Sequence, residues 1–494
     1  MSTSEFRSYT DDDIKTVIEK YWFFLERLEF DEAQSYLNNQ QMLTSSSPHA
    51  ADRVWQDILR AIAQLATAEH SYFGLGFLVP KSLFRNQTSA QLRDTYFKIG
   101  RPYRGELRRI NEAARSEGGV TTAPLRKTIV EHFVNHCEAR YSLITFYNEL
   151  QFAAKNYDEL VAISPDKLKV IIKDYGNTKE SDLFIKTAII SRELQLLLTA
   201  FQIKQELAKA DMFNALLLLK QLQSQYSAFF RDITPNAAAK NSSSSFFNFF
   251  GKPPKAAKLG LLTWFKSLYD ALLSKFSFYF MDVLLPYTPA PEVRPCHTAC
   301  FANVNIFQRK CAPVAIMIVM YLSNDEKDSF AGFGYKHPDT IGFTIGPPKA
   351  AGQIKANLAQ TKSINVQDNR FPMLLCLTSD KQKLNDQHSR VIYQRLAKLV
   401  PSAMDWRTKY ELDERENNTT FCARIEQKLF FTIFFDRKIN ERESAVTNFI
   451  TETLNQLRFT KLYQELRSPS KAHTPSQSHS SSLSSSSLPG GPLM

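Results

Sequence analysis

Two groups of histidine and cysteine residues have the types and spacings that could hold a metal ion. His132 and His136 lie four residues apart, so on one face of a helix both rings would reach the same ion. The second group follows a proline-rich stretch and consists of Cys296, His297, Cys300 and Cys311. Neither group has the further close ligands of a zinc site. We therefore expect two semi-buried histidines, ordinary reduced cysteines and no bound metal.

Motifs of the common enzyme classes do not occur in the sequence. There is no P-loop, dinucleotide-binding, nucleophile-elbow, HExxH or EF-hand pattern. Glycine is scarce, with 16 of 494 residues, whereas nucleotide-cradling folds need several glycines at tight turns. We expect a protein without catalytic residues or a cofactor, although missing motifs leave an unusual hydrolase open.

A loop rich in glycine and aromatic residues runs from Ser329 to Pro338. Its glycines permit left-handed backbone or close approach, and its rings offer stacking and hydrogen bonds. A partner-docking loop and a tight turn packed into its own sheet both remain open. The candidate contacts in this loop are Gly332, Phe333, Gly334, Tyr335, His337 and Pro338.

Basic residues give the chain a net charge of +11 and a pI near 9.1. Arg101, Arg104 and Arg108 would share one face of a helix between residues 92 and 114. They could bind phosphates or an acidic partner, and a solvated helix face is the simpler alternative. The net charge also leaves a nucleic-acid-binding protein open, although we do not expect nucleic acid as the partner.

A phenylalanine-rich loop lies in residues 235–258, a segment with four lysines and no acidic residue. Its aromatic side chains are Phe246, Phe247, Phe249 and Phe250. Aromatic and basic residues together could lie on an anionic membrane, or could cover a groove on this chain or on a partner. The membrane interpretation suggests a trafficking adaptor with a longin-like domain as an alternative function.

The most apolar helix is expected over residues 261–285. Leu261, Phe265, Leu268 and Phe276 follow helical spacing and form part of a broad buried face. Phe278 lies ~200° around the helix from Phe276. We therefore predict that this helix joins two parts of the molecule and that Phe278 meets a second, partner surface.

The first 290 residues predict an all-α helical bundle. Thr10 and Asp13 form a capping-box pattern at the start of the first helix. Further helices are expected at 31–42, 52–78, 92–114, 128–150, 183–207 and 211–230. The helix at 128–150 has an apolar stripe made of Ile129, Phe133, Cys137, Tyr141 and Ile144. Prolines between 286 and 295 then mark a domain boundary.

Residues 291–466 predict a small α+β domain with one antiparallel sheet. Strands are expected at 314–322, 329–333, 341–345, 373–378, 419–423 and 429–435, the last two forming a hairpin. A helix at 386–399 and another opened by a capping box of Asn440 and Glu443 would cover the sheet. The serine-rich tail, 467–494, is expected to be disordered, with Ser468 and Thr474 as candidate phosphorylation sites.

The sequence predicts a cytosolic protein. No signal peptide is visible, and the longest apolar run, 312–322, is interrupted by Pro313 and is far shorter than the ~20 residues of a spanning helix. Six cysteines in so long a chain form no disulfide framework. Membrane contact would be peripheral at most.

Five segments together resemble one family. They are LATAEHSY (65–72), FVNHCEARYSLITFY (133–147), LLSKFSFYF (272–280), DSFAGFGYKHP (328–338) and FDRKINERES (435–444). In this collinear order the chain, from about residue 17 to residue 457, resembles the family of the second subunit of the KICSTOR complex. The serine-rich tail departs from the family pattern.

The resemblance implies a non-enzymatic scaffold. It implies a helical domain followed by a profilin- or roadblock-like α+β domain, and peripheral localisation on the lysosome. Kaptin, the integrin-alpha FG-GAP-repeat subunit and the large seizure-threshold protein would be partners. The complex would hold the GATOR complex on the lysosome and support inhibition of TOR complex one when amino acids or glucose are short.

Overall fold

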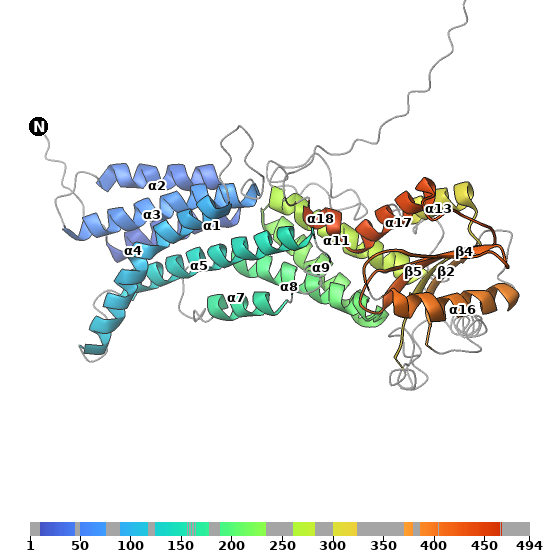
Figure 1. Ribbon diagram of the computed structural model, residues 1–494. Helices are drawn as coiled ribbons and strands as arrows, with labels where there is room; N and C mark the ends of the chain where they lie inside the picture. The colour runs from blue at the N-terminus through green and yellow to red at the C-terminus, as the bar shows by residue number, and fades with distance from the viewer. Residues whose placement is uncertain are drawn as a thin grey trace, which may run out of the picture.

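The computed structural model describes residues 10–44, 50–75, 89–116, 124–155, 157, 160, 163, 165–176, 188–233, 260–281, 300–323, 370–378, 386–403, 405–464 and 466. The described part of the chain is elongated, with long helices at one end and a β-sheet flanked by helices at the other (Figure 1). The coarse α+β prediction with an antiparallel sheet is therefore confirmed.

The long helices pack side by side over the first part of the chain. They are α1 (Asp11–Glu26), α2 (Phe30–Thr44), α3 (Ala50–Phe73), α4 (Ser89–Ser116), α5 (Pro124–Ala153), α7 (Asp166–Gly176), α8 (Ile189–Ala208), α9 (Met212–Ile233) and α11 (Gly260–Tyr279). All the predicted helices of this region are present, and α7 was not predicted. The α4 and α5 helices pack along each other, as do α8 and α9.

The predicted capping box begins α1. The backbone N–H of Asp13 donates to the Thr10 hydroxyl at 3.2 Å, and the backbone N–H of Thr10 donates to the Asp13 carboxylate at 3.1 Å. Two N–H groups that lack helical partners are thereby satisfied. Leu28, with φ at 58°, lies in the turn between α1 and α2.

The α11 helix is buried on almost every side, and this corrects the prediction for Phe278. Phe276 and Phe278 are each only 3% exposed. The helix packs against α3, α8 and α9 and also against α13 (Cys300–Cys311) and α18 (Thr460–Gln464). Because these helices surround α11, the ring opposite Phe276 contacts this chain itself and does not project toward a separate partner.

The sheet contains five antiparallel strands in the order β2-β1-β5-β4-β3. They are β1 (Ala315–Met320), β2 (Met373–Thr378), β3 (Lys409–Asp413), β4 (Asn418–Arg424) and β5 (Leu429–Phe435). The predicted hairpin is present, with Phe421 opposite Ile433. The central strand β5 is buried on both faces, as the apolar residues on both of its faces predict. The partly buried strand β3 was not predicted.

Alternate residues of the sheet face two different layers. Met317, Cys422 and Phe434 pack with Leu396 of α16 (Asp386–Ser402). The opposite face, which includes Ile316 and Ile433, belongs to a core that also takes in α17 (Ser444–Leu457) and the helices of the bundle. The two layers follow from the two-residue period of strands.

Three predictions in this region differ from the structure or lie outside it. The capping box at α17 is wrong, because Glu443 makes no side-chain cap and the Asn440 side chain accepts from the Arg442 N–H. Helix α13 was not predicted as a helix. The predicted strands at 329–333 and 341–345, the proline linker and the tail lie outside the described residues.

Candidate functional site

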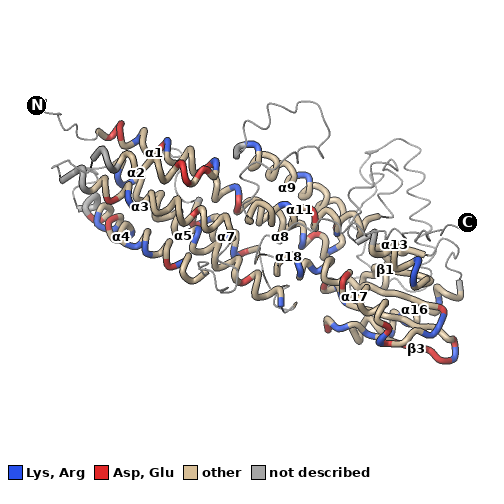
Figure 2. Tube along the Cα trace, turned by 90° about the horizontal axis from the view of Figure 1, so that it is seen from above, with Lys and Arg blue, Asp and Glu red and all other residues tan. Residues whose placement is uncertain are grey.

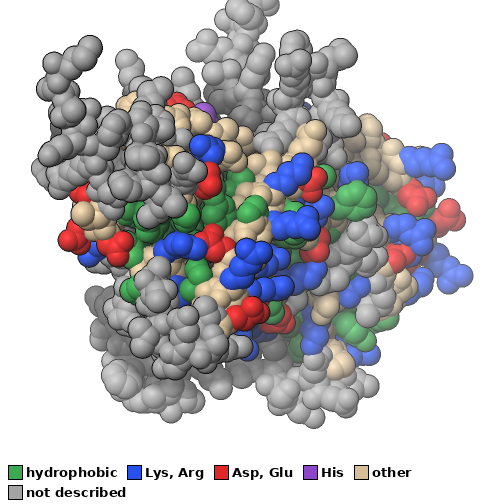
Figure 3. Space-filling model, turned by 90° about the vertical axis from the view of Figure 1, so that its left-hand side faces the viewer, with side chains coloured by type: hydrophobic (Ala, Val, Ile, Leu, Met, Phe, Trp, Pro, Cys, Tyr) green, Lys and Arg blue, Asp and Glu red, His purple; other side chains and the backbone are tan. Residues whose placement is uncertain are grey.

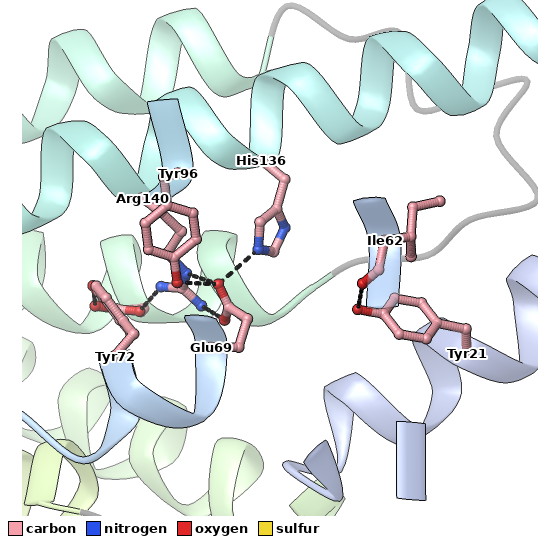
Figure 4. A network of polar contacts seen from close by, with 8 residues as sticks. Tyr21, Ile62, Glu69, Tyr72, Tyr96, His136 and Arg140 are labelled. Atoms are coloured by element: carbon pink, nitrogen blue, oxygen red, sulfur yellow. Dashed lines mark hydrogen bonds and ion pairs between the residues drawn. The ribbon is translucent and has the colours of Figure 1, made fainter. Parts of the chain in front are cut away.

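A dense group of ionisable side chains lies inside the helical bundle (Figure 4). Glu69 comes from α3, His136 and Arg140 from α5, and Glu193 from α8, and all four are 0% exposed. We call these residues, together with Tyr72, Tyr96 and Tyr147, the buried ion network. Its side chains bring four different helices to one point in the core.

Arg140 is the centre of the network. Its Nε and one terminal nitrogen donate to the two carboxylate oxygens of Glu69, each at 2.8 Å. The other terminal nitrogen forms an ion pair with Glu193. The guanidinium also lies over the Tyr72 ring, with its central carbon 4.1 Å from the ring centroid. A planar guanidinium suits such a double ion pair because its N–H groups have a fixed fork geometry.

Three tyrosine hydroxyls complete the coordination of the two carboxylates. Tyr96 donates to Glu69 at 2.9 Å. Tyr72 and Tyr147 donate to the same oxygen of Glu193 at 2.5 and 2.8 Å. Burial, followed by the neighbouring carboxylates, raises the pKa of all three tyrosines well above the ordinary value. They therefore act as neutral hydrogen-bond donors.

Electrostatics keeps the Glu69 carboxylate charged in the core. Burial alone raises its pKa, but the charges of Arg140 and His136 and their hydrogen bonds outweigh burial and lower the pKa to about 2. The two carboxylates in turn outweigh the effect of burial on Arg140 and raise its pKa. The ion pairs and hydrogen bonds of this network offset part of the cost of removing its charges from water.

The histidines of the first predicted metal group belong to this core. His136 Nε2 lies 2.9 Å from a Glu69 oxygen, and the rings of His132 and His136 contact Trp22 at centroid distances of 5.0 and 5.2 Å. Burial lowers the pKa of His136, and it lowers that of His132 to about 3. They are fully buried rather than semi-buried, because α1 covers this side of α5.

No cluster of three or more potential ligands that could hold a metal ion occurs among the residues that the structure describes. Cys296 and His297 of the second predicted group lie outside those residues. Cys311 is partly exposed at the end of α13, and its carbonyl oxygen accepts a hydrogen bond from Arg437. This contact ties α13 to the segment that follows β5.

A second buried polar cluster joins the bundle to the sheet. Lys275 of α11 forms an ion pair with Glu426, which lies in the turn between β4 and β5. Tyr157 donates to the carbonyl of Ile425 at 2.9 Å and lies 3.3 Å from the second Glu426 oxygen. Burial lowers the pKa of Lys204 to about 8. The negative charge of Glu426 opposes this shift, whereas the positive charge of Lys275 adds to it. Opposite charges from the two regions therefore meet in a buried junction.

Aromatic and arginine side chains surround this junction. The rings of Tyr157 and Trp406 meet edge to face at 4.4 Å. Arg458 lies over Tyr157 at 4.9 Å and donates to the carbonyl of Arg424. In addition, the Trp264 indole of α11 donates to the carbonyl of Leu462 at 3.1 Å. These contacts fix the bundle against the C-terminal region.

The predicted arginine face lies on α4, along an outer edge of the bundle (Figure 2). Arg101 and Arg108 are exposed, whereas Arg104 forms an ion pair with Glu138 of α5 at 2.5 Å. Figure 3 views this end of the molecule, where Lys and Arg side chains gather in the middle of the face with apolar side chains among them. One of the three predicted cations is therefore already paired.

The other predicted interaction residues cannot be placed on this structure. The loop residues Gly332, Phe333, Gly334, Tyr335, His337 and Pro338 lie outside the described residues. The same holds for Phe246, Phe247, Phe249, Phe250, Ser468 and Thr474.

Sequence reasoning missed the charged members of the buried ion network, although a signal was present. Glu69 lies four residues after Leu65 and three before Tyr72, and so continues the apolar stripe of α3. The predicted stripe of α5 included Tyr141, but Tyr141 is 40% exposed and Arg140 is buried in its place. A charged residue in phase with an apolar stripe indicates a buried ion pair.

The fold defines a mixed protein in which a helical bundle is locked to an antiparallel α+β unit. The family model described as KICSTOR complex C12orf66 like matches residues 11–471, and the chain belongs to this family. KICSTOR subunit 2 of Danio rerio is 23% identical over 470 residues, which cover 92% of this chain and 96% of that relative. KICSTOR subunit 2 of Xenopus laevis is 22% identical over 479 residues, which cover 92% and 97%.

Within the described ranges, none of the helices combines the length and the apolar character that crossing a membrane requires.

Proposed function

We propose that this chain is a non-enzymatic scaffold subunit of a KICSTOR-like complex. Family membership across residues 11–471 is the observation that carries the proposal. The structure supports it, because the ionisable groups best suited to chemistry, Glu69, His136, Arg140 and Glu193, are buried and bonded to one another. Such groups rigidify a platform on which other proteins assemble.

The proposed cellular role is to help hold the GATOR complex at the lysosome and to support inhibition of TOR complex one during amino-acid or glucose deprivation. Kaptin, the integrin-alpha FG-GAP-repeat subunit and the large seizure-threshold protein are the proposed partners. The five-stranded antiparallel sheet with helices on both faces supports a profilin- or roadblock-like domain in the C-terminal region. The locked junction at Lys275 and Glu426 supports a rigid two-part platform.

Affinity purification of the tagged full chain from fed and starved cells, followed by mass spectrometry, tests this function. We expect the other KICSTOR subunits to co-purify in stoichiometric amounts and the GATOR complex to accompany them. The surface variant Arg390→Glu, on the sheet end of the molecule, serves as a matched control and should recover the same set. Recovery of the intact, folded chain without any of these subunits would overturn the proposal.

A further inference from the structure

Gly105 lies in the middle of helix α4, and packing within the described chain does not explain it. A Cβ atom built at Gly105 meets no other atom within 4 Å. By contrast, a Cβ at Gly100 would lie 3.1 Å from the Cβ of Cys137, and one at Gly260 would lie 2.8 Å from the carbonyl oxygen of Gly74. Those two glycines allow close packing inside the molecule, whereas Gly105 faces outward.

A glycine in a helix interior destabilises the helix relative to alanine. Alanine would fit at position 105 without any contact. A side chain at position 105 would therefore stabilise the described part of the chain. Its absence indicates that a partner outside the described residues approaches the α4 backbone.

Arginines surround Gly105 on the helix surface. Arg101 lies four residues and Arg104 one residue before Gly105, while Arg108 and Arg109 lie three and four residues after it. Residues three and four apart are neighbours on a helix. Arg104 is paired with Glu138. In the described ranges, the exposed residues Arg101, Arg108 and Arg109 have no carboxylate partner. The nearby Glu106 is bound to Arg126 at 2.5 Å.

An exposed aromatic ring extends this surface. Phe97 lies one turn before Arg101, is 42% exposed, and has the Arg101 guanidinium 5.8 Å from its ring centroid. Aromatic and arginine residues are enriched in protein–protein interfaces and among the residues that dominate their binding energy. We call Phe97, Arg101, Gly105, Arg108 and Arg109 the Gly105 face.

Glycine distinguishes between the anionic partners that such a basic surface could bind. Arginine side chains extend well beyond a methyl group, so they would reach a lipid headgroup or a polynucleotide equally well with alanine at position 105. A missing Cβ matters only to a partner whose own backbone or small side chains rest on the helix. Glu112, which is exposed, lies four residues after Arg108 and three after Arg109, but no ion pair joins these side chains among the described residues. The combination of Gly105 with three arginines that form no ion pair in the described ranges therefore favours a protein partner of acidic character.

We propose that the Gly105 face binds an acidic helix of another protein, which crosses α4 at Gly105 and pairs its carboxylates with Arg101, Arg108 and Arg109. The inference rests on the proposed scaffold function and adds to it a surface and a partner chemistry. Phe97 would contact an apolar side chain beside the crossing point.

Fluorescence anisotropy with the purified full chain tests the proposal. The probe is a labelled synthetic helical peptide with glutamates along one face, an alanine at its centre and one flanking leucine, and the reference is the same peptide with lysines in place of the glutamates. We expect the acidic peptide to bind and the lysine peptide not to bind. The affinity for the acidic peptide should fall as the salt concentration rises. Arg101→Glu should weaken binding by about tenfold or more, whereas Arg390→Glu on α16 should leave it unchanged.

Substitutions of the glycine give the decisive result. Gly105→Ala should raise the melting temperature and yet weaken peptide binding, and Gly105→Leu should abolish binding while the chain stays folded. Unchanged affinity in both variants overturns the proposal, as does binding to phosphatidylserine vesicles in preference to the peptide. These outcomes leave co-purification with the other subunits untouched, so a failure of this surface is distinguishable from a failure of the proposed function.

Discussion

Lys275 and Glu426 form an ion pair across the junction between the helical bundle and the sheet, although 151 residues separate them in the chain. Their exposures are only 1% and 3%. Tyr157 adds a hydrogen bond to Glu426, and Lys204 adds a second positive charge near that carboxylate. A buried pair of this kind fixes the relative position of two regions, because moving either would leave a charge without its partner.

Lys275→Met should lower the free energy of unfolding by about 3–5 kcal/mol, since it leaves Glu426 buried without its main counter-charge. The double variant Lys275→Met with Glu426→Leu should recover most of this loss, because two apolar side chains replace the pair. Urea unfolding of the three proteins measures both effects. A double variant as unstable as the single one would show that packing around the pair, and not the isolated charge, dominates.

Arg140→Met should be at least as damaging as Lys275→Met, about 3–5 kcal/mol or more. It removes the shared partner of Glu69 and Glu193 and leaves two carboxylates in the core. Arg140→Lys keeps the charge but lacks the planar fork, so its stability should lie between those of the wild type and Arg140→Met. Thermal unfolding followed by circular dichroism ranks the three, and equal melting temperatures for all of them would contradict a central role for Arg140.

Acidification should destabilise the protein from about pH 6.5 downward because of His132. Its pKa is about 3 in the folded chain, against 6.5 when unperturbed, so between these values the unfolded state binds a proton that the folded state does not. Stability therefore rises with pH in this window, and about 2 kcal/mol is lost on going from pH 6.5 to pH 5.

His132→Phe supplies the control for this pH dependence, since it preserves the aromatic contact with Trp22 and removes the titrating group. Chemical unfolding at several pH values between 5 and 7 should give a shallower slope for the variant. The residual slope reports His136, whose pKa is shifted in the same direction. Identical slopes for variant and wild type would mean that His132 is accessible to protons in the folded state.

Phe276→Ala and Phe278→Ala should cost similar amounts of stability, about 3–5 kcal/mol each, as truncations of fully buried rings. The helical wheel alone would predict a much smaller cost for Phe278. Equilibrium unfolding of the two variants settles the comparison. A cost below about 1 kcal/mol for Phe278→Ala would restore the hypothesis that this ring serves a partner.

Local patterns in the sequence were enough to predict most elements. Apolar residues at helical spacing identified the long helices, the Thr10–Asp13 capping box began α1, and alternating or uninterrupted apolar runs identified β1, β2, β4 and β5. The strand β3 escaped prediction because it is only partly buried and polar. The prediction of a capping box at Asn440 was wrong because the Asn440 side chain accepts from the backbone N–H of Arg442, two residues later, and not from that of Glu443.

The sequence by itself determined the α+β class, the helices and most strands, because the period of apolar residues reports which side of an element is buried. Only the tertiary structure decided what each buried side met. The partners of Arg140 come from α3 and α8, the partner of Lys275 comes from the connection between β4 and β5, and Phe278 became core because helices surround α11. Periodicity is a local property, whereas the partner of a buried charge or ring depends on which distant elements pack against it.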